Sequence, residues 1–200
     1  MKTKGLLALL LGSILVACWS CESYEGSSGP SSDGATSAVV KADEGLYTRY
    51  NLHYVAERGT VRGSFANWTD WPGHGFVPYN SKVRAEGWSN RIRFTTDTGL
   101  TIMFEINPGQ MGMSSSDYLA LITSPTPVTY DDLSDVDRQG IQAGKALVGM
   151  SREGVKIALG YPAKHRTPSL DDNHWTYWRG RHDTYTVEFD ADGKVTRISR

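Results

Sequence analysis

The sequence predicts an α+β fold in three parts: a small antiparallel β domain, a helical connector, and a C-terminal domain of helix and strands. Apolar residues alternate with polar ones in residues 45–108, which is the period of half-buried strands. Residues 109–139 carry short helical patterns that begin at serines. Residues 140–200 hold a capped helix and then three strand patterns separated by turn residues. No cysteine follows Cys21, so an apolar core rather than disulfides must stabilise this fold.

The first residues have the features of a signal peptide, which we assign to residues 1–17. Lys2 and Lys4 precede an uncharged apolar run at residues 5–16. This run is shorter than the roughly 20 residues of a membrane-spanning helix, and it has the length of a signal-peptide core. The segment Leu15-Val16-Ala17-Cys18 then resembles a lipobox. The resemblance implies cleavage before Cys18 and its acylation, and two or three acyl chains hold a protein stably on a lipid membrane.

Two other interpretations of this end fit the sequence less well. An ordinary secreted protein with a chance cysteine fits less well, because charge, run length and cleavage residues all agree. Cys18 and Cys21 also match a C-x-x-C redox motif, but such a pair needs a helix start in a packed fold. Trp19 after the cysteine favours, by resemblance to lipoprotein sorting signals, the outer membrane facing the periplasm. Residues 18–44 are rich in serine and glycine and predict a flexible tether, in which Cys21 is a spare thiol.

Residues 45–108 predict about five short antiparallel strands. Tyr50, Leu52 and Tyr54 alternate with polar neighbours, and the same period recurs up to Ile106. Turn residues such as Asp97-Thr98-Gly99 separate the runs. The strands suggest a small barrel or a strongly bent sheet, for which an SH3-like barrel is one candidate.

The connector, residues 109–139, predicts two short helices. The first covers residues 114–122, with Ser115 or Ser116 as its N-cap. The second is acidic, and its aspartates allow two interpretations: a metal site, or negative charge at a helix start. We favour the second because the helix dipole stabilises carboxylates there and no defined ligand spacing is present. The aspartates are Asp131, Asp132, Asp135 and Asp137.

Residues 140–200 carry the most informative pattern. Ser151 suits an N-cap, and Gly160 and Pro162 suit the end of the same helix. Four sequence strings follow one another in this segment: GMSREGVKIALGYP, TPSL, HWTYW and TVEFDADGKVTRI. Their order resembles the BamE-like family, also called SmpA/OmlA. The resemblance implies an ααβββ domain, two helices on a three-stranded antiparallel sheet, that binds proteins and is not catalytic.

The chain departs from that family in two respects. A β-rich domain stands between the expected lipid anchor and the resembling segment. Gly154 also lies where the family commonly has Gln or Glu, so the reciprocal capping box with Ser151 is missing. The family's partner-contacting residues cannot be matched to positions of this sequence.

The sequence shows no catalytic motif, and we therefore expect no enzyme activity, no catalytic residues, no metal and no cofactor. P-loop, HExxH, GxSxG and dinucleotide-binding patterns are all missing. A net charge of −1 argues against a general electrostatic nucleic-acid binder. Three histidines near aspartates could bind zinc or be exposed residues of loops and strands, which we favour because their spacing is irregular. They are His165, His174 and His182.

A loop rich in aromatic residues is the candidate binding surface, with one further tryptophan downstream; its members are Trp68, Trp71, His74, Phe76 and Trp178. The loop could stack on a sugar or enter a partner's groove. It could also fold over the barrel and bury its own aromatic side chains, which we favour because tryptophan is highly buried on average. The leading functional hypothesis is a non-enzymatic envelope lipoprotein that binds a protein partner, in outer-membrane assembly or integrity. The alternative is a periplasmic module that binds peptidoglycan or another glycan.

Overall fold

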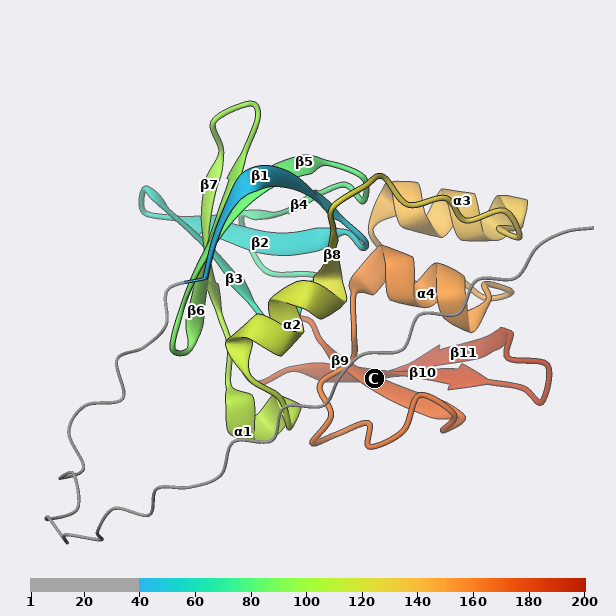
Figure 1. Cartoon of the computed structure of the whole chain (residues 1–200). Helices are drawn as coiled ribbons and strands as arrows, with labels where there is room; N and C mark the ends of the chain where they lie inside the picture. Colours follow the sequence, from blue (N-terminus) through green and yellow to red (C-terminus); the bar gives the residue numbers. More distant parts are fainter. Residues whose placement is uncertain (1–39) are drawn as a thin grey trace, which may run out of the picture. The chain divides into compact units, whose positions relative to one another are not determined.

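Residues 40–200 are described by a computed structural model, and side chains are described from Gly45 onward (Figure 1). Four earlier predictions lie outside these residues: the signal peptide of residues 1–17, the acylation of Cys18, the spare thiol of Cys21 and most of the tether. Among the described residues, no helix has the length and apolar character needed to span a bilayer.

The larger sheet contains eight strands and curls on itself (Figure 1). Its order is β4-β2-β3-β7-β6-β5-β1-β8. All neighbours pair antiparallel except β3 and β7, which are parallel. The strands are β1 (Val40–Thr48), β2 (Leu52–Glu57), β3 (Thr60–Ser64), β4 (His74–Val77), β5 (Lys82–Trp88), β6 (Arg91–Thr96), β7 (Thr101–Glu105) and β8 (Thr123–Ser124).

Four short helices and a second sheet complete the described part of the chain. The sheet has the order β11-β10-β9 and is antiparallel. Helices α3 and α4 pack against each other, and Figure 1 shows α4 next to this sheet and α3 farther from it. The elements are α1 (Pro108–Met111), α2 (Ser115–Ile122), α3 (Asp135–Ala143), α4 (Arg152–Leu159), β9 (His174–Trp178), β10 (Thr184–Phe189) and β11 (Val195–Ser199).

The ends of α4 confirm the local prediction. Ser151 is the N-cap and accepts a hydrogen bond from the Gly154 backbone N–H, while Gly160 lies just past the last helical residue. Helix α2 also begins at a serine, although its N-cap is Ser114 rather than Ser115 or Ser116. Serine hydroxyls satisfy backbone N–H groups that have no partner within the first turn, which is why helices begin at these positions.

One buried carboxylate caps both α3 and α4. Asp137 accepts hydrogen bonds from the backbone N–H and the hydroxyl of Ser134, which closes a capping box at the start of α3. It also accepts from the backbone N–H and the hydroxyl of Ser151, at 2.7 and 3.1 Å. The capping group that α4 lacks in its own sequence is therefore supplied by α3. Gly154 is required beside it, because a Cβ at this position would collide with the Asp137 carboxylate.

The predicted fold class, a small N-terminal β-barrel with an SH3-like barrel as one candidate, a connector and a BamE-like ααβββ domain, is wrong. The first sheet is an eight-stranded curled sheet, and its last strand, β8, comes from the segment predicted as a helical connector. Strand β1 begins at Val40, inside the predicted tether.

Two buried polar side chains also join the larger sheet to the later helices. Asn51 donates to the carbonyls of Ile141 and Ala158, and His53 bonds the Ala158 carbonyl at 2.7 Å. Except for Val55, the buried apolar side chains of sheets and helices belong to one core cluster. Unsatisfied polar groups are costly in a core, so these bonds tie the two regions together.

Candidate functional site

A cleft of about 260 Å³ lies beside the aromatic loop, which we define as residues 67–75. We name it the tryptophan cleft. It is formed where the loop meets the ends of two hairpins, β2–β3 and β9–β10. Its lining residues are Val55, Glu57, Arg62, Trp68, Trp71, Arg181 and His182. The cleft thus combines two indole rings with two guanidinium groups.

Hydrogen bonds to the second sheet hold the loop in place. The backbone N–H groups of Thr69 and Asp70 donate to the carbonyls of Trp178 and Arg179, at 3.1 and 3.2 Å. The Thr69 hydroxyl lies 3.2 Å from both the Trp178 carbonyl and the Tyr185 hydroxyl. A loop that is already ordered loses less conformational entropy when it binds a ligand. The backbone between Trp68 and Trp71 is accordingly preorganised.

Trp71 is the more exposed of the two tryptophans in the cleft. It is 42% exposed, whereas tryptophan is usually well buried. Its ring lies against Gly180, where a Cβ atom would collide with the indole. Gly180 therefore allows the ring to approach the β9–β10 turn closely. The burial that we favoured for this loop does not hold for Trp71.

The charged groups of the cleft leave a local excess of positive charge. Arg62 and Arg181 are both exposed, and neither forms an ion pair within residues 45–200. The cleft lining contains one carboxylate, that of Glu57. Its Oε1 atom lies 3.9 Å from the Nε atom of Arg58, which is exposed and does not line the cleft. Guanidinium groups without an ion-pair partner can form bidentate hydrogen bonds to carboxylate or phosphate groups. Next to aromatic rings, they could bind such groups on a ligand that also contains a ring.

His74 and Phe76 lie on β4 and are grouped with His53 of β2 rather than with the two tryptophans. The His53 Nδ1 and His74 Nε2 atoms are 2.8 Å apart, and the rings are stacked. Because the Ala158 carbonyl can only accept, His53 donates to it from Nε2. Neutral His53 therefore accepts at Nδ1 from His74 Nε2–H. Burial lowers the pKa of His53 to about 4; the Ala158 carbonyl opposes this shift and His74 adds to it.

The three histidines considered as zinc ligands lie in different places, and Trp178 lies beside one of them. Trp178 packs partly buried against the core, with its ring 5.5 Å from that of His165. His174 begins β9 and is exposed, whereas His182 lines the tryptophan cleft. Within the described residues, His, Cys, Asp and Glu side chains nowhere gather in a group of three that could hold a metal ion.

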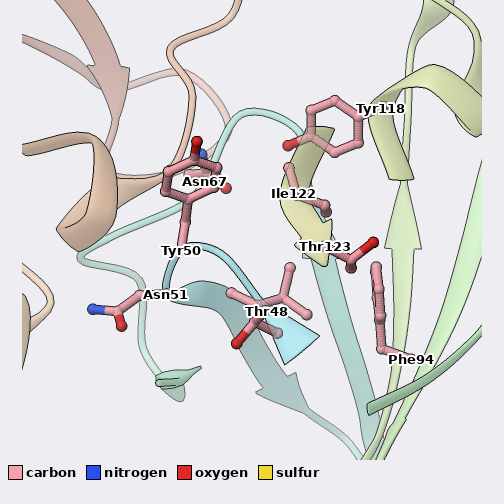
Figure 2. A pocket seen from close by; sticks show the side chains of 10 residues that line it. Thr48, Tyr50, Asn51, Asn67, Phe94, Tyr118, Ile122 and Thr123 are labelled. Carbon is pink, nitrogen blue, oxygen red and sulfur yellow. The ribbon is translucent and has the colours of Figure 1, made fainter. Parts of the chain in front are cut away.

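A second hollow is enclosed in the core between the larger sheet and α2 (Figure 2). Its volume is only about 10 Å³, which is room for roughly one water molecule. Polar residues that include Thr48, Asn51 and Thr123 are part of its lining. The hollow is too small to receive a ligand, so the open tryptophan cleft is the stronger candidate site.

No known protein family, curated protein or solved structure matches this chain. The resemblance of residues 140–200 to the BamE-like family thus stays a prediction.

The sequence indicated Trp68 and Trp71 as members of a binding surface and His182 only as a candidate zinc ligand, and it did not indicate the other residues of the cleft. Trp68 and Trp71 stood out because aromatic residues are unusual in a loop rich in glycine and proline. Arg62 and Arg181 gave no signal, because they are far apart in the sequence and each is an ordinary exposed residue of a hairpin. Only the close approach of the β2–β3 and β9–β10 hairpins brings them together.

Proposed function

We propose that this chain is a non-catalytic binding protein of the cell envelope, anchored through acylated Cys18, and that it binds a glycan in the tryptophan cleft. One observation carries the proposal: Trp71 is held exposed, on a glycine, in an ordered cleft with Trp68. Pyranose rings present flat C–H faces, and indole rings offer large rigid surfaces for such contacts. The cleft volume of about 260 Å³ is close to the lower end for small-ligand sites.

The described surface supports a large protein–protein interface less well than it supports a glycan-binding cleft. Only three large apolar side chains are exposed among residues 45–200: Trp71, Val148 and Ile198. Stable protein interfaces have a desolvated core rich in apolar and aromatic residues. A single exposed tryptophan in a narrow cleft fits a chain of sugar rings better than a flat protein surface.

The test is co-sedimentation of the purified full-length protein with peptidoglycan. We expect Trp71→Ala to weaken binding by about tenfold, since an aromatic contact is worth roughly 0.5–1.5 kcal/mol beyond burial. Gly180→Ala keeps both indoles but displaces the Trp71 ring, and it should weaken binding as well. Trp88→Ala is the matched control, because Trp88 lies on β5 and does not line the cleft.

Equal sedimentation of Trp71→Ala and the wild type would refute a role for the cleft. No sedimentation of the wild type, together with capture of an envelope protein that depends on Trp71, would favour the protein-partner hypothesis instead. Urea unfolding of each variant shows whether the fold is preserved.

A further inference from the structure

A second, basic cleft lies on the other side of the loop segment that carries the tryptophans. Thr69 and Asp70 line this cleft, whereas Trp68 and Trp71 line the first one. Its volume is about 190 Å³. Its lining residues are Thr69, Asp70, Lys145, Ala146, Arg179, Tyr185, Ile198 and Arg200, and we name it the basic cleft.

The two clefts also share the β9–β10 turn. Arg179 belongs to the basic cleft and Arg181 to the tryptophan cleft. One loop segment and one turn therefore separate the two hollows, and a polymer lying over them would contact both. Along the loop segment, Trp68 and Trp71 line one cleft and Thr69 and Asp70 line the other, while cations line both.

The charges in the two clefts are strongly unbalanced for a chain whose net charge is −1. Five lysine and arginine side chains line them, against the two carboxylates of Glu57 and Asp70. Within residues 45–200, none of these five cations forms an ion pair. A local excess of unpaired positive charge attracts anionic ligands.

Arg179 is the best-positioned cation of the basic cleft. Its guanidinium carbon lies 5.4 Å from the centroid of the buried Tyr185 ring. Stacking on an aromatic face restrains the planar group and leaves its edge N–H donors free for bidentate bonds to carboxylate or phosphate. Lys145, exposed just beyond α3, adds a mobile point charge.

We propose that the ligand is an anionic glycan: its sugar rings stack in the tryptophan cleft, and the basic cleft holds its carboxylate or phosphate groups. This inference rests on the proposed function, because it names the class of glycan that the same surface binds. Aromatic stacking supplies contact area that does not depend on charge, while Lys145 and Arg179 supply the preference for acidic sugars.

Binding of defined oligosaccharides to the full-length protein in detergent tests the proposal. The probes are chitohexaose, which is uncharged, a galacturonate hexamer, which carries carboxylates, and phosphorylated chitohexaose. We expect at least one charged probe to bind about tenfold more tightly than chitohexaose, and the charged probe that binds better identifies the group recognised. Raising the salt concentration from 50 to 500 mM should weaken only the charged probes.

The variants separate charge recognition from stacking. The double variant Lys145→Gln, Arg179→Gln should bind the charged probes about tenfold more weakly and chitohexaose within twofold of the wild type. Its matched control is Arg91→Gln, which removes an exposed cation of β6 and should leave all affinities unchanged. Urea unfolding confirms that each variant keeps its fold.

Different failures point to different errors. Equal affinity for charged and uncharged probes, or no effect of the double variant, would overturn the anionic-glycan inference and leave the tryptophan cleft intact. If none of the three probes binds, the proposed glycan-binding function itself fails. A glutamate hexamer that binds as tightly as the galacturonate hexamer would show a site for acidic peptides and overturn the glycan assignment.

Discussion

Acidification from pH 7.5 to pH 4 should destabilise this protein through His53. The imidazole is fully buried between the larger sheet and α4, and its pKa falls from an ordinary 6.5 to about 4. In the unfolded chain the same group binds a proton at about pH 6.5. The unfolded state therefore binds more protons throughout this window, and stability falls as the pH falls. The two pKa values correspond to a loss of about 3 kcal/mol.

Urea unfolding at a series of pH values measures this loss. With a slope of roughly 2 kcal/mol/M, the midpoint should fall by about 1–2 M between pH 7.5 and pH 4. His53→Gln can still donate to the Ala158 carbonyl but does not titrate, so most of the slope above pH 4 should disappear. Burial lowers the pKa of His74 as well, which leaves a residual slope in the same direction. Parallel pH profiles for the wild type and His53→Gln would refute this reasoning.

Two further substitutions test the capping of α4 and the loop before β9. Gly154→Ala should lower the free energy of unfolding by about 2–4 kcal/mol, although alanine favours helices, because its methyl group collides with Asp137. Gly109→Ala, at an open helical position, is the urea-unfolding control. Arg152→Lys should cost about 1–2 kcal/mol, because one ammonium cannot replace a guanidinium bonded to four oxygens of residues 170–173. Faster amide hydrogen exchange in that loop alone would confirm the assignment, and unchanged exchange would contradict it.

Features encoded over a few neighbouring residues were predictable. Helix α4 starts at Ser151 and ends before Gly160 as expected, because a hydroxyl and a glycine act within one helical turn. The three C-terminal strands were recognised from their alternation and from the turn at residues 190–193. Such signals need no knowledge of the rest of the fold.

Pairing between distant segments was not predictable in the same way. The parallel contact of β3 with β7 joins strands that look like members of separate hairpins. Strand β8 has only two residues, Thr123 and Ser124, and it follows α2 with no alternation to reveal it. The candidate site likewise combines residues that the local sequence could predict with residues that it could not. Trp68 and Trp71 could be found from local composition, whereas Arg62 and Arg181 depend on which hairpins meet.

Polar residues in the core help to explain why the predicted fold class was wrong. Asn51 and His53 read as ordinary polar positions of an alternating strand, whose side chains would face solvent. Both are instead almost fully buried, and they satisfy carbonyls at the ends of α3 and α4. The carbonyls at a helix end have no partner within the helix, so another element has to supply donors. Asn51, just before β2, and His53 of β2 supply them here, just as Asp137 of α3 supplies the cap that Gly154 cannot. In both cases a residue that looks deficient or misplaced in its own segment is completed by a distant one: Asn51 and His53 join the larger sheet to α3 and α4, and Asp137 joins α3 to α4.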